Sequence, residues 1–171
     1  MKKIVNLILI SVLILTNLNA QNDVNSAFLL KWENSKNYLL EIAAIMPEDT
    51  YSYKPTEQQM SFQEQLLHIS QNMVWLGETY FTGVDFIKSE KVKPKTKEAI
   101  IKELEIAFNS VYELIKNSTI EDLTIEVDFF AGPKSKLQIL NLLQDHVTHH
   151  RGQLIVYLNL NNIEPPKYVG W

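Results

Sequence analysis

Apolar residues recur at helical spacing, three, four or seven positions apart, in four segments of this chain. Proline and glycine residues lie between these segments, where they end or interrupt helices. The pattern therefore predicts four amphipathic helices, over residues 28–46, 61–83, 96–114 and 135–160.

Two of these helices begin with a recognisable capping signal. Ser61 is followed three residues later by Glu64, and Ser135 is followed at the same spacing by Gln138. In such a capping box the hydroxyl and the longer side chain each bond to the backbone N–H of the other residue. These pairs predict the starts of the second and fourth helices.

Four amphipathic helices of similar length predict an all-α four-helix bundle with a long crossover before the last helix. Residues 122–130 of that crossover alternate partly like a strand. We interpret them as extended chain and not as a sheet, because a single short strand has no partner.

The N-terminus has the pattern of a cleaved secretory signal. Lys2 and Lys3 precede an almost wholly apolar run over residues 4–15, and Ala20 is a small residue before a polar stretch. We predict a signal peptide over residues 1–20, a mature domain over 21–171, and a periplasmic or secreted location. The alternative is an uncleaved anchor, although the apolar run is short for a membrane span of about 20 residues.

Composition narrows the class of protein further. Hydrophobic residues make up 46% of the 171 residues and charged residues 21%, as in a globular domain with a packed core. The net charge of −4 argues against a nucleic acid partner, which needs a basic face. The chain has no cysteine, which excludes disulfides, thiolate ligands and lipid attachment through a cysteine.

Three of the four histidines lie within five residues, at His146, His149 and His150. On a helix, His146 and His150 point about 40° apart and can take adjacent positions on one metal ion. Their face also carries apolar residues, so it is predicted to face the core: Ile139, Leu142, Leu143, Leu154, Tyr157 and Leu160. Two unpaired imidazoles there would cost burial energy, which a shared ion would offset.

His68, in the middle of the second helix, is the natural third ligand. Gln65 and Asn72 lie within about 60° of it around the helix, so the site should be polar-lined, at the edge of the core. Three protein ligands with a fourth position open are typical of catalytic zinc sites. A hydrogen-bonded core pair of His146 and His150, with no metal, is the alternative.

His149 points about 100° away from His150 and is not expected to bind the same ion. It is interpreted either as a surface histidine or as a base or proton shuttle beside the metal. For Asp145 and Arg151 we expect an ion pair, with a hydrogen bond to an imidazole as the alternative. Tyr157 is expected in the core with its hydroxyl bonded.

Two further residues could border a substrate. Gln153 lies on the ligand face and could hold a ligand or a substrate. Trp75 lies within about 20° of His68 around its helix. It could form the wall of a substrate pocket, but packing in the core or between helices is the default.

The C-terminal pattern resembles that of the DinB/YfiT-like family. The resemblance covers residues 24–168 and includes the run from Asp145 to Gln153. Its most specific part is His146 to Gln153, coupled to an upstream helical histidine. Other matching runs are residues 46–56, 60–69, 157–158 and 165–166. The sequence departs from the family in its export signal and in Asn159, where a basic residue often follows Tyr-Leu.

The resemblance implies a four-helix bundle with a divalent metal on three histidines, carried here onto His68, His146 and His150. Zn²⁺ and Ni²⁺ are favoured, with Mn²⁺ and Fe²⁺ as alternatives. It also implies a metal-dependent hydrolase or a thiol-dependent transferase acting on an unidentified small molecule. A non-catalytic metal-binding bundle is the alternative. We expect no nucleic acid partner and no membrane anchor after signal cleavage, and a homodimer is left open.

Overall fold

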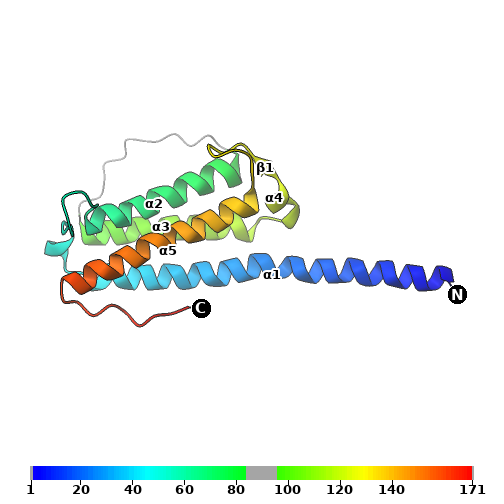
Figure 1. Cartoon of the computed structure of the whole chain (residues 1–171), viewed down its shortest axis with the longest axis horizontal. Coiled ribbons are helices and arrows are strands. Elements are labelled where there is room, and N and C mark those ends of the chain that lie inside the picture. Colours follow the sequence, from blue (N-terminus) through cyan, green and yellow to red (C-terminus); the bar gives the residue numbers. More distant parts are fainter. Residues whose placement is uncertain (1, 84–95, 171) are drawn as a thin grey trace.

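A computed structural model describes residues 2–83 and 96–170, with side chains from residue 24 onward. Four long helices form a bundle, α1 (Lys2–Ile45), α2 (Phe62–Gly77), α3 (Lys97–Lys116) and α5 (Lys136–Leu160), which confirms the predicted fold class (Figure 1). A 3₁₀ turn, η1 (Glu48–Thr50), follows α1, and a π-helical turn, η2 (Glu78–Thr82), continues α2 to Gly83.

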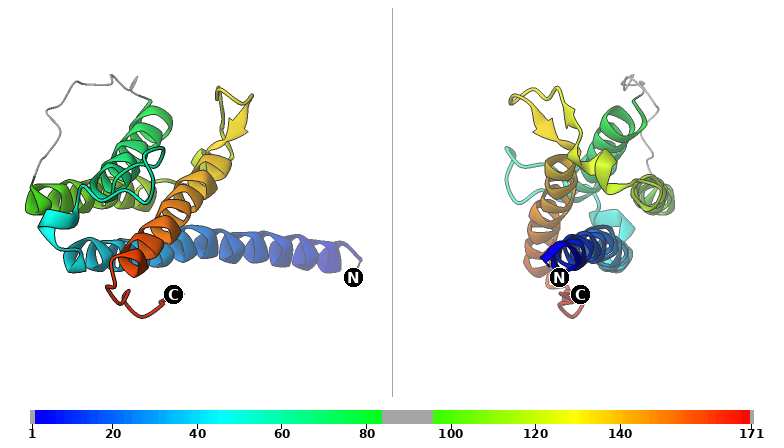
Figure 2. Two further views of the ribbon diagram at one scale, coloured as in Figure 1. Left: turned by 60° about the vertical axis from the view of Figure 1, so that its left-hand side comes forward. Right: turned by 90° about the vertical axis from the view of Figure 1, so that its right-hand side faces the viewer.

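The helices are arranged in the order α1–α3–α2–α5 around the bundle, because α1 contacts α3 and α5, and α2 contacts the same two helices (Figure 2). The bond from Ser70 to Glu103 and the packing of Gly77 on Val111 show that α2 and α3 run in the same direction. α5 runs opposite to α2, and this antiparallel contact carries the candidate site.

The core is built on the predicted apolar positions. Trp32 is fully buried on α1, its ring lies 4.8 Å from that of Phe108 on α3, and its indole N–H donates to the Phe108 carbonyl at 3.0 Å. Within the predicted second and third helices, the apolar residues at helical spacing are buried: Phe62, Leu66, Ile69, Met73, Leu76, Ile100, Leu104, Ala107 and Val111.

The crossover from α3 to α5 is long, as expected, but the prediction that it contains no sheet is wrong. After the short helix α4 (Ile120–Thr124), strand β1 (Glu126–Val127) pairs antiparallel with β2 (Lys134–Ser135). The partner strand lies in the crossover itself. Gly132, at φ +86°, lies in the turn that brings it back, a backbone conformation that favours glycine.

The predicted signal segment falls within the N-terminal part of α1, which extends beyond the other helices (Figure 1). The cleavage of residues 1–20 stays a prediction, as does the boundary of the mature domain. Within the described part of the chain, we find no helix that combines the length and the apolar character needed to cross a membrane.

Candidate metal site

His68 is placed by the start of α2. The Ser61 hydroxyl accepts from the Glu64 N–H at 3.3 Å, and the Ser61 N–H donates to the Glu64 carboxylate at 2.7 Å, which confirms the predicted capping box. These bonds hold the pKa of Glu64 at about 2. The helix then buries Leu66, Leu67 and Ile69 and leaves His68 half-buried on the side facing α5.

His146 and His150 are placed by α5, whose Ser135–Gln138 capping box is also confirmed. The buried arc of α5 is centred about 80° further round the helix than His146. His150 is therefore buried and His146 is half-buried at the edge of the arc. Leu142 and Leu160 lie on the opposite side of His146 and are 36% and 54% exposed, so their predicted core positions are wrong.

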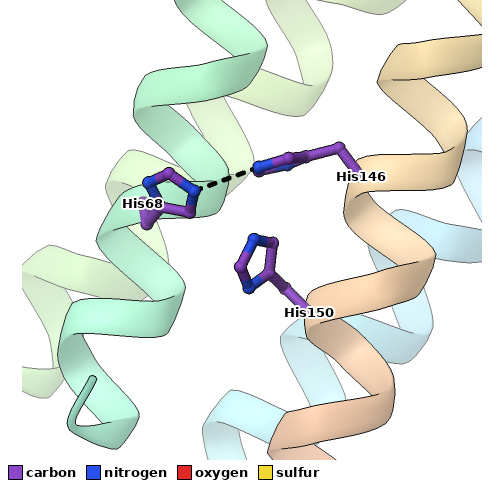
Figure 3. A group of neighbouring side chains, drawn as sticks. All are labelled: His68, His146 and His150. Atoms are coloured by element: carbon purple, nitrogen blue, oxygen red, sulfur yellow. Dashed lines mark hydrogen bonds between the residues drawn. The ribbon is translucent and has the colours of Figure 1, made fainter. Parts of the chain in front are cut away.

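The three imidazoles meet between α2 and α5 (Figure 3). Nε2 of His146 lies 3.1 Å from Nε2 of His68, and each of the three histidines offers one ring nitrogen within 4.8 Å of the others. Ring nitrogens on one zinc ion should lie roughly 3–3.5 Å apart, given bonds of about 2.0–2.1 Å. The His68–His146 pair therefore has the spacing of two ligands, and this group could hold a metal ion.

The close approach of Nε2 of His146 to Nε2 of His68 requires a proton or a cation between the two nitrogens. Two imidazole lone pairs repel each other at 3.1 Å, so either one ring nitrogen donates a hydrogen or an ion lies between them. His146 also has a buried Nδ1 with no hydrogen-bond partner among the described residues. Both features fit a residue whose Nε2 is a metal ligand and whose Nδ1 carries the proton.

A hydrogen-bonded group of side chains orients His150. Its Nδ1 donates to Oε1 of Gln65 at 2.5 Å, because a carboxamide oxygen can only accept. The Gln65 amide donates to Oε1 of Gln153 at 2.6 Å and to the Tyr157 hydroxyl at 3.4 Å. With its proton at Nδ1, His150 keeps the lone pair of Nε2 for a ligand bond. Such partners fix the ring orientation of metal-binding histidines.

Burial keeps the three imidazoles neutral. Desolvation, together with the neighbouring imidazoles His150, His68 and His149, lowers the pKa of His146 to about 3. Desolvation followed by the charges of His68 and His149 lowers the pKa of His150 to about 4, and desolvation lowers the pKa of His68. Only a neutral imidazole can bind a metal, so the site is ready for an ion at neutral pH.

His149 lies outside the group, as predicted. It is exposed, and its Nε2 accepts from the Gln153 amide at 2.9 Å. Its ring meets that of His150 edge-on at 4.9 Å. Gln153 thus bonds to Gln65 on one side and to His149 on the other, which connects the exposed histidine to the buried one through two carboxamides.

Two predictions about neighbouring residues have different outcomes. Tyr157 is buried and its hydroxyl donates to the Met60 carbonyl at 2.8 Å, which confirms a core role. The prediction of an ion pair between Asp145 and Arg151 is wrong, because the two side chains point about 120° apart around α5. Arg151 is instead buried against α1, with its guanidinium 5.1 Å from the Tyr38 ring and 3.5 Å from the Ser35 hydroxyl.

Trp75 is half-buried in an aromatic cluster with Tyr80, Phe129 and Phe130, which agrees with the default interpretation of packing between elements.

The pocket beside His68 is lined by other residues than Trp75. A cavity of about 380 Å³ opens beside His68 and is lined by Lys54, Glu57, Gln58, Gln59, Met60, Glu64, Leu67, His68 and Gln71. Lys54 pairs with Glu64 at 3.2 Å on its border.

Sequence reasoning missed this pocket. Its lining comes mostly from the link before α2, whose polar run from Glu57 to Gln59 was the available signal. The run shows no periodicity, and only the fold brings it beside His68.

The fold and the site define a class of protein, a four-helix bundle with a three-histidine group between two antiparallel helices. The sequence model of the DinB family matches residues 18–168, and the chain belongs to this family. Over 157 residues the chain is 27% identical to the uncharacterized protein YjoA of Bacillus subtilis (strain 168), covering 86% of this chain and 95% of YjoA.

Two solved structures share the fold. The crystal structure of the DinB-like YjoA from Bacillus subtilis aligns with a TM-score of 0.69 at 23% identity, over 83% of this chain and 96% of the other. That of a DinB-like protein from Bacillus cereus ATCC 10987 aligns with a TM-score of 0.72 at 20% identity, over 84% and 97% of the two chains. At these identities the likeness is one of fold.

Proposed function

We propose that the protein binds one divalent metal ion through Nε2 of His68, His146 and His150. The observation that carries this proposal is the convergence of the three imidazoles, with two Nε2 atoms 3.1 Å apart. An all-imidazole donor set suits Zn²⁺ and Ni²⁺. Mn²⁺ and Fe²⁺ are the weaker alternatives, because both bind nitrogen donors less tightly than Ni²⁺ or Zn²⁺ and Mn²⁺ favours oxygen donors.

We further propose that the bound metal is catalytic. Among the described residues, no fourth histidine or carboxylate joins the group, so one or more coordination positions are left for substrate or water. The cavity beside His68 has room for a small molecule, and its lining of amides and charged groups suits a polar one. A divalent ion here would activate water or a thiol, or polarise a carbonyl, in a hydrolase or transferase reaction.

His149 is the candidate for moving protons in that reaction. It is exposed, it lies next to the ligand His150, and Gln153 holds its ring through Nε2. Because the Gln153 amide donates to Nε2, the neutral ring carries its proton at Nδ1. A histidine with this exposure can exchange protons with solvent and with a substrate beside the metal.

The first experiment is metal analysis of the purified protein, followed by assays with ester, amide and thiol-transfer substrates. We expect about one equivalent of metal and activity that a chelator removes and added metal restores. A protein that takes up no Zn²⁺ or Ni²⁺ would overturn the metal site. A loaded protein that turns over no substrate would favour the alternative function.

That alternative is a non-catalytic bundle in which the metal stabilises the contact between α2 and α5. It is favoured by one observation, that the cavity is lined by His68 but by neither His146 nor His150. The two functions differ in whether an exogenous ligand reaches the ion. Azide or cyanide should shift the absorption spectrum of the Co²⁺-substituted protein if the metal has an open position.

We also propose that the protein acts after export, in the periplasm or outside the cell, on a small-molecule substrate. The basic, apolar and small-residue order of residues 1–20 supports export. The net charge of −4 supports the absence of a nucleic acid partner. A homodimer is an assembly that light scattering on the purified protein would test.

A further inference from the structure

Asn72 has a feature that the proposed metal site does not explain. It lies on α2 one turn after His68, and its Oδ1 is buried with no hydrogen-bond partner. Of the side chains that the structure describes, five have such a buried polar atom, and another of the five is Nδ1 of His146. An unpaired buried acceptor and an unpaired buried donor each cost stability, and a bond between them would remove both costs.

The antiparallel register of α2 and α5 places these two residues at the same level of the bundle. Gln65 on α2 bonds to His150, Gln153 and Tyr157 on α5. Asn72 lies seven residues further along α2, two turns on and within about 20° of Gln65 around the helix. Seven residues back along α5 from Gln153 is His146, so Asn72 should face His146 as Gln65 faces Gln153.

We propose that Asn72 is a positioning residue whose Oδ1 accepts a hydrogen bond from Nδ1–H of His146 when Nε2 of His146 holds the metal. This inference rests on the proposed metal site. A neutral imidazole carries a single N–H, so a metal on Nε2 places the proton on Nδ1. The carboxamide oxygen can only accept, which matches the donor that metal binding creates.

Both proposed metal ligands on α5 would then have the same kind of support. Gln65, one turn before His68, fixes the ring of His150 through Nδ1 at 2.5 Å. Asn72, one turn after His68, would fix the ring of His146 through its own Nδ1. One helix would therefore supply a metal ligand and two carboxamides, and each carboxamide would orient a ligand on the opposite helix.

The test compares the Zn²⁺ affinities of the wild-type protein and two variants at Asn72 by competition with a chromophoric chelator. Asn72→Leu removes the acceptor at nearly constant volume, and we expect about 10–100-fold weaker Zn²⁺ binding. Asn72→Asp keeps an acceptor oxygen and should bind Zn²⁺ at least as tightly as wild type. A merely structural role would not separate these two variants in this way.

Gln144→Leu is the matched control. Gln144 also has a buried oxygen without a partner, but its amide donates to Ser35 of α1 at 3.0 Å, away from the histidines. We expect this variant to keep the wild-type Zn²⁺ affinity. Equal affinities for Asn72→Leu and wild type would overturn the proposal for Asn72 and leave the metal site standing. A wild-type protein that binds neither Zn²⁺ nor Ni²⁺ would overturn both.

A crystal structure of the Zn²⁺-loaded wild-type protein gives a second test that does not depend on a variant folding. We expect Oδ1 of Asn72 within about 3.2 Å of Nδ1 of His146. A loaded site in which Nδ1 of His146 bonds to another group, or to none, would overturn the proposal.

Discussion

The imidazoles of His68, His146 and His150 differ in how they are supported. Gln65, on the neighbouring helix α2, accepts from Nδ1 of His150. Nε2 of His146 faces Nε2 of His68, and Nδ1 of His146 has no hydrogen-bond partner among the described residues. His149, one residue from His150, points out of the bundle to Gln153. The helical step of about 100° per residue is the reason that two adjacent histidines have such different surroundings.

This difference predicts that alanine variants of His149 and His150 separate metal binding from turnover. His150→Ala should lose both the metal and any activity, because two imidazoles hold a divalent ion much less firmly than three. His149→Ala should keep its metal and lower the rate by about 10²–10⁴-fold if it transfers protons. Metal stoichiometry and turnover are measured on the same samples. Loss of metal in His149→Ala with retention in His150→Ala would mean that the ligand assignment is wrong.

The lowered pKa values predict that acid destabilises the metal-free protein. Each histidine of the group has a lower pKa in the folded state than its ordinary value of about 6.5 in the unfolded chain. Between about pH 6.5 and pH 4 the unfolded state therefore binds more protons, and the free energy of unfolding falls as the pH falls. Urea unfolding of chelator-treated protein at pH 7.5 and pH 5 measures this change.

A variant with Asn in place of all three histidines is the control for the pH experiment. It should lose most of the difference in unfolding free energy between pH 7.5 and pH 5. Glu64 contributes little in this range, since its depressed pKa, at about 2, affects stability only at lower pH. An unchanged pH dependence in the control would show that other groups carry the effect.

At the scale of single elements, caps fix where the helices that carry the site begin. α2 and α5 each begin with a Ser whose hydroxyl accepts from the backbone three residues on, and α3 begins at Thr96 with a similar bond. The start of α2 matters most for the site, because Gln65, His68 and Asn72 follow it within three turns.

Removing the cap of α2 should destabilise the protein by a measurable amount. Ser61→Ala deletes the acceptor for the Glu64 N–H and should lower the free energy of unfolding by about 1 kcal/mol. Ser110→Ala, at an exposed position within α3, is the matched control and should change stability by less than about 0.5 kcal/mol. Urea unfolding measures both, and equal effects of the two substitutions would contradict a role for the cap.

At the scale of the whole molecule, the order α1–α3–α2–α5 places α2 diagonally opposite α1. The link from α1 to α2 and the link from α3 to α5 each join helices at diagonal positions. Both links are long, because each must cross an end of the bundle. The first of these links borders the cavity beside His68. The topology thus brings a polar loop to the edge of the candidate metal site.

We predict that protein isolated from its native host lacks residues 1–20. The basic start, the apolar run and the small residue Ala20 before a polar stretch are the features that a signal peptidase recognises. Intact mass spectrometry of the soluble protein measures the N-terminus. Soluble protein that retains the mass of residues 1–20 would contradict cleavage.

Much of the fold could be predicted from the sequence, because its signals are local. The spacing of apolar residues gave four helices, and Ser61 with Glu64 and Ser135 with Gln138 gave two of their starts. The four-residue spacing of His146 and His150 put them on one helix face. These inferences depend only on the geometry of a single helix, which is the same in every protein.

The tertiary structure alone decided how the helices face one another. The apolar pattern of α5 could not give the centre of its buried arc, so Leu142 and Leu160 were placed in the core although they are exposed. Nor could it show that Lys134 and Ser135 pair with residues 126–127, or that the link before α2 forms a pocket beside His68. These features arise from contacts between segments distant in the sequence, and no single-helix periodicity encodes them.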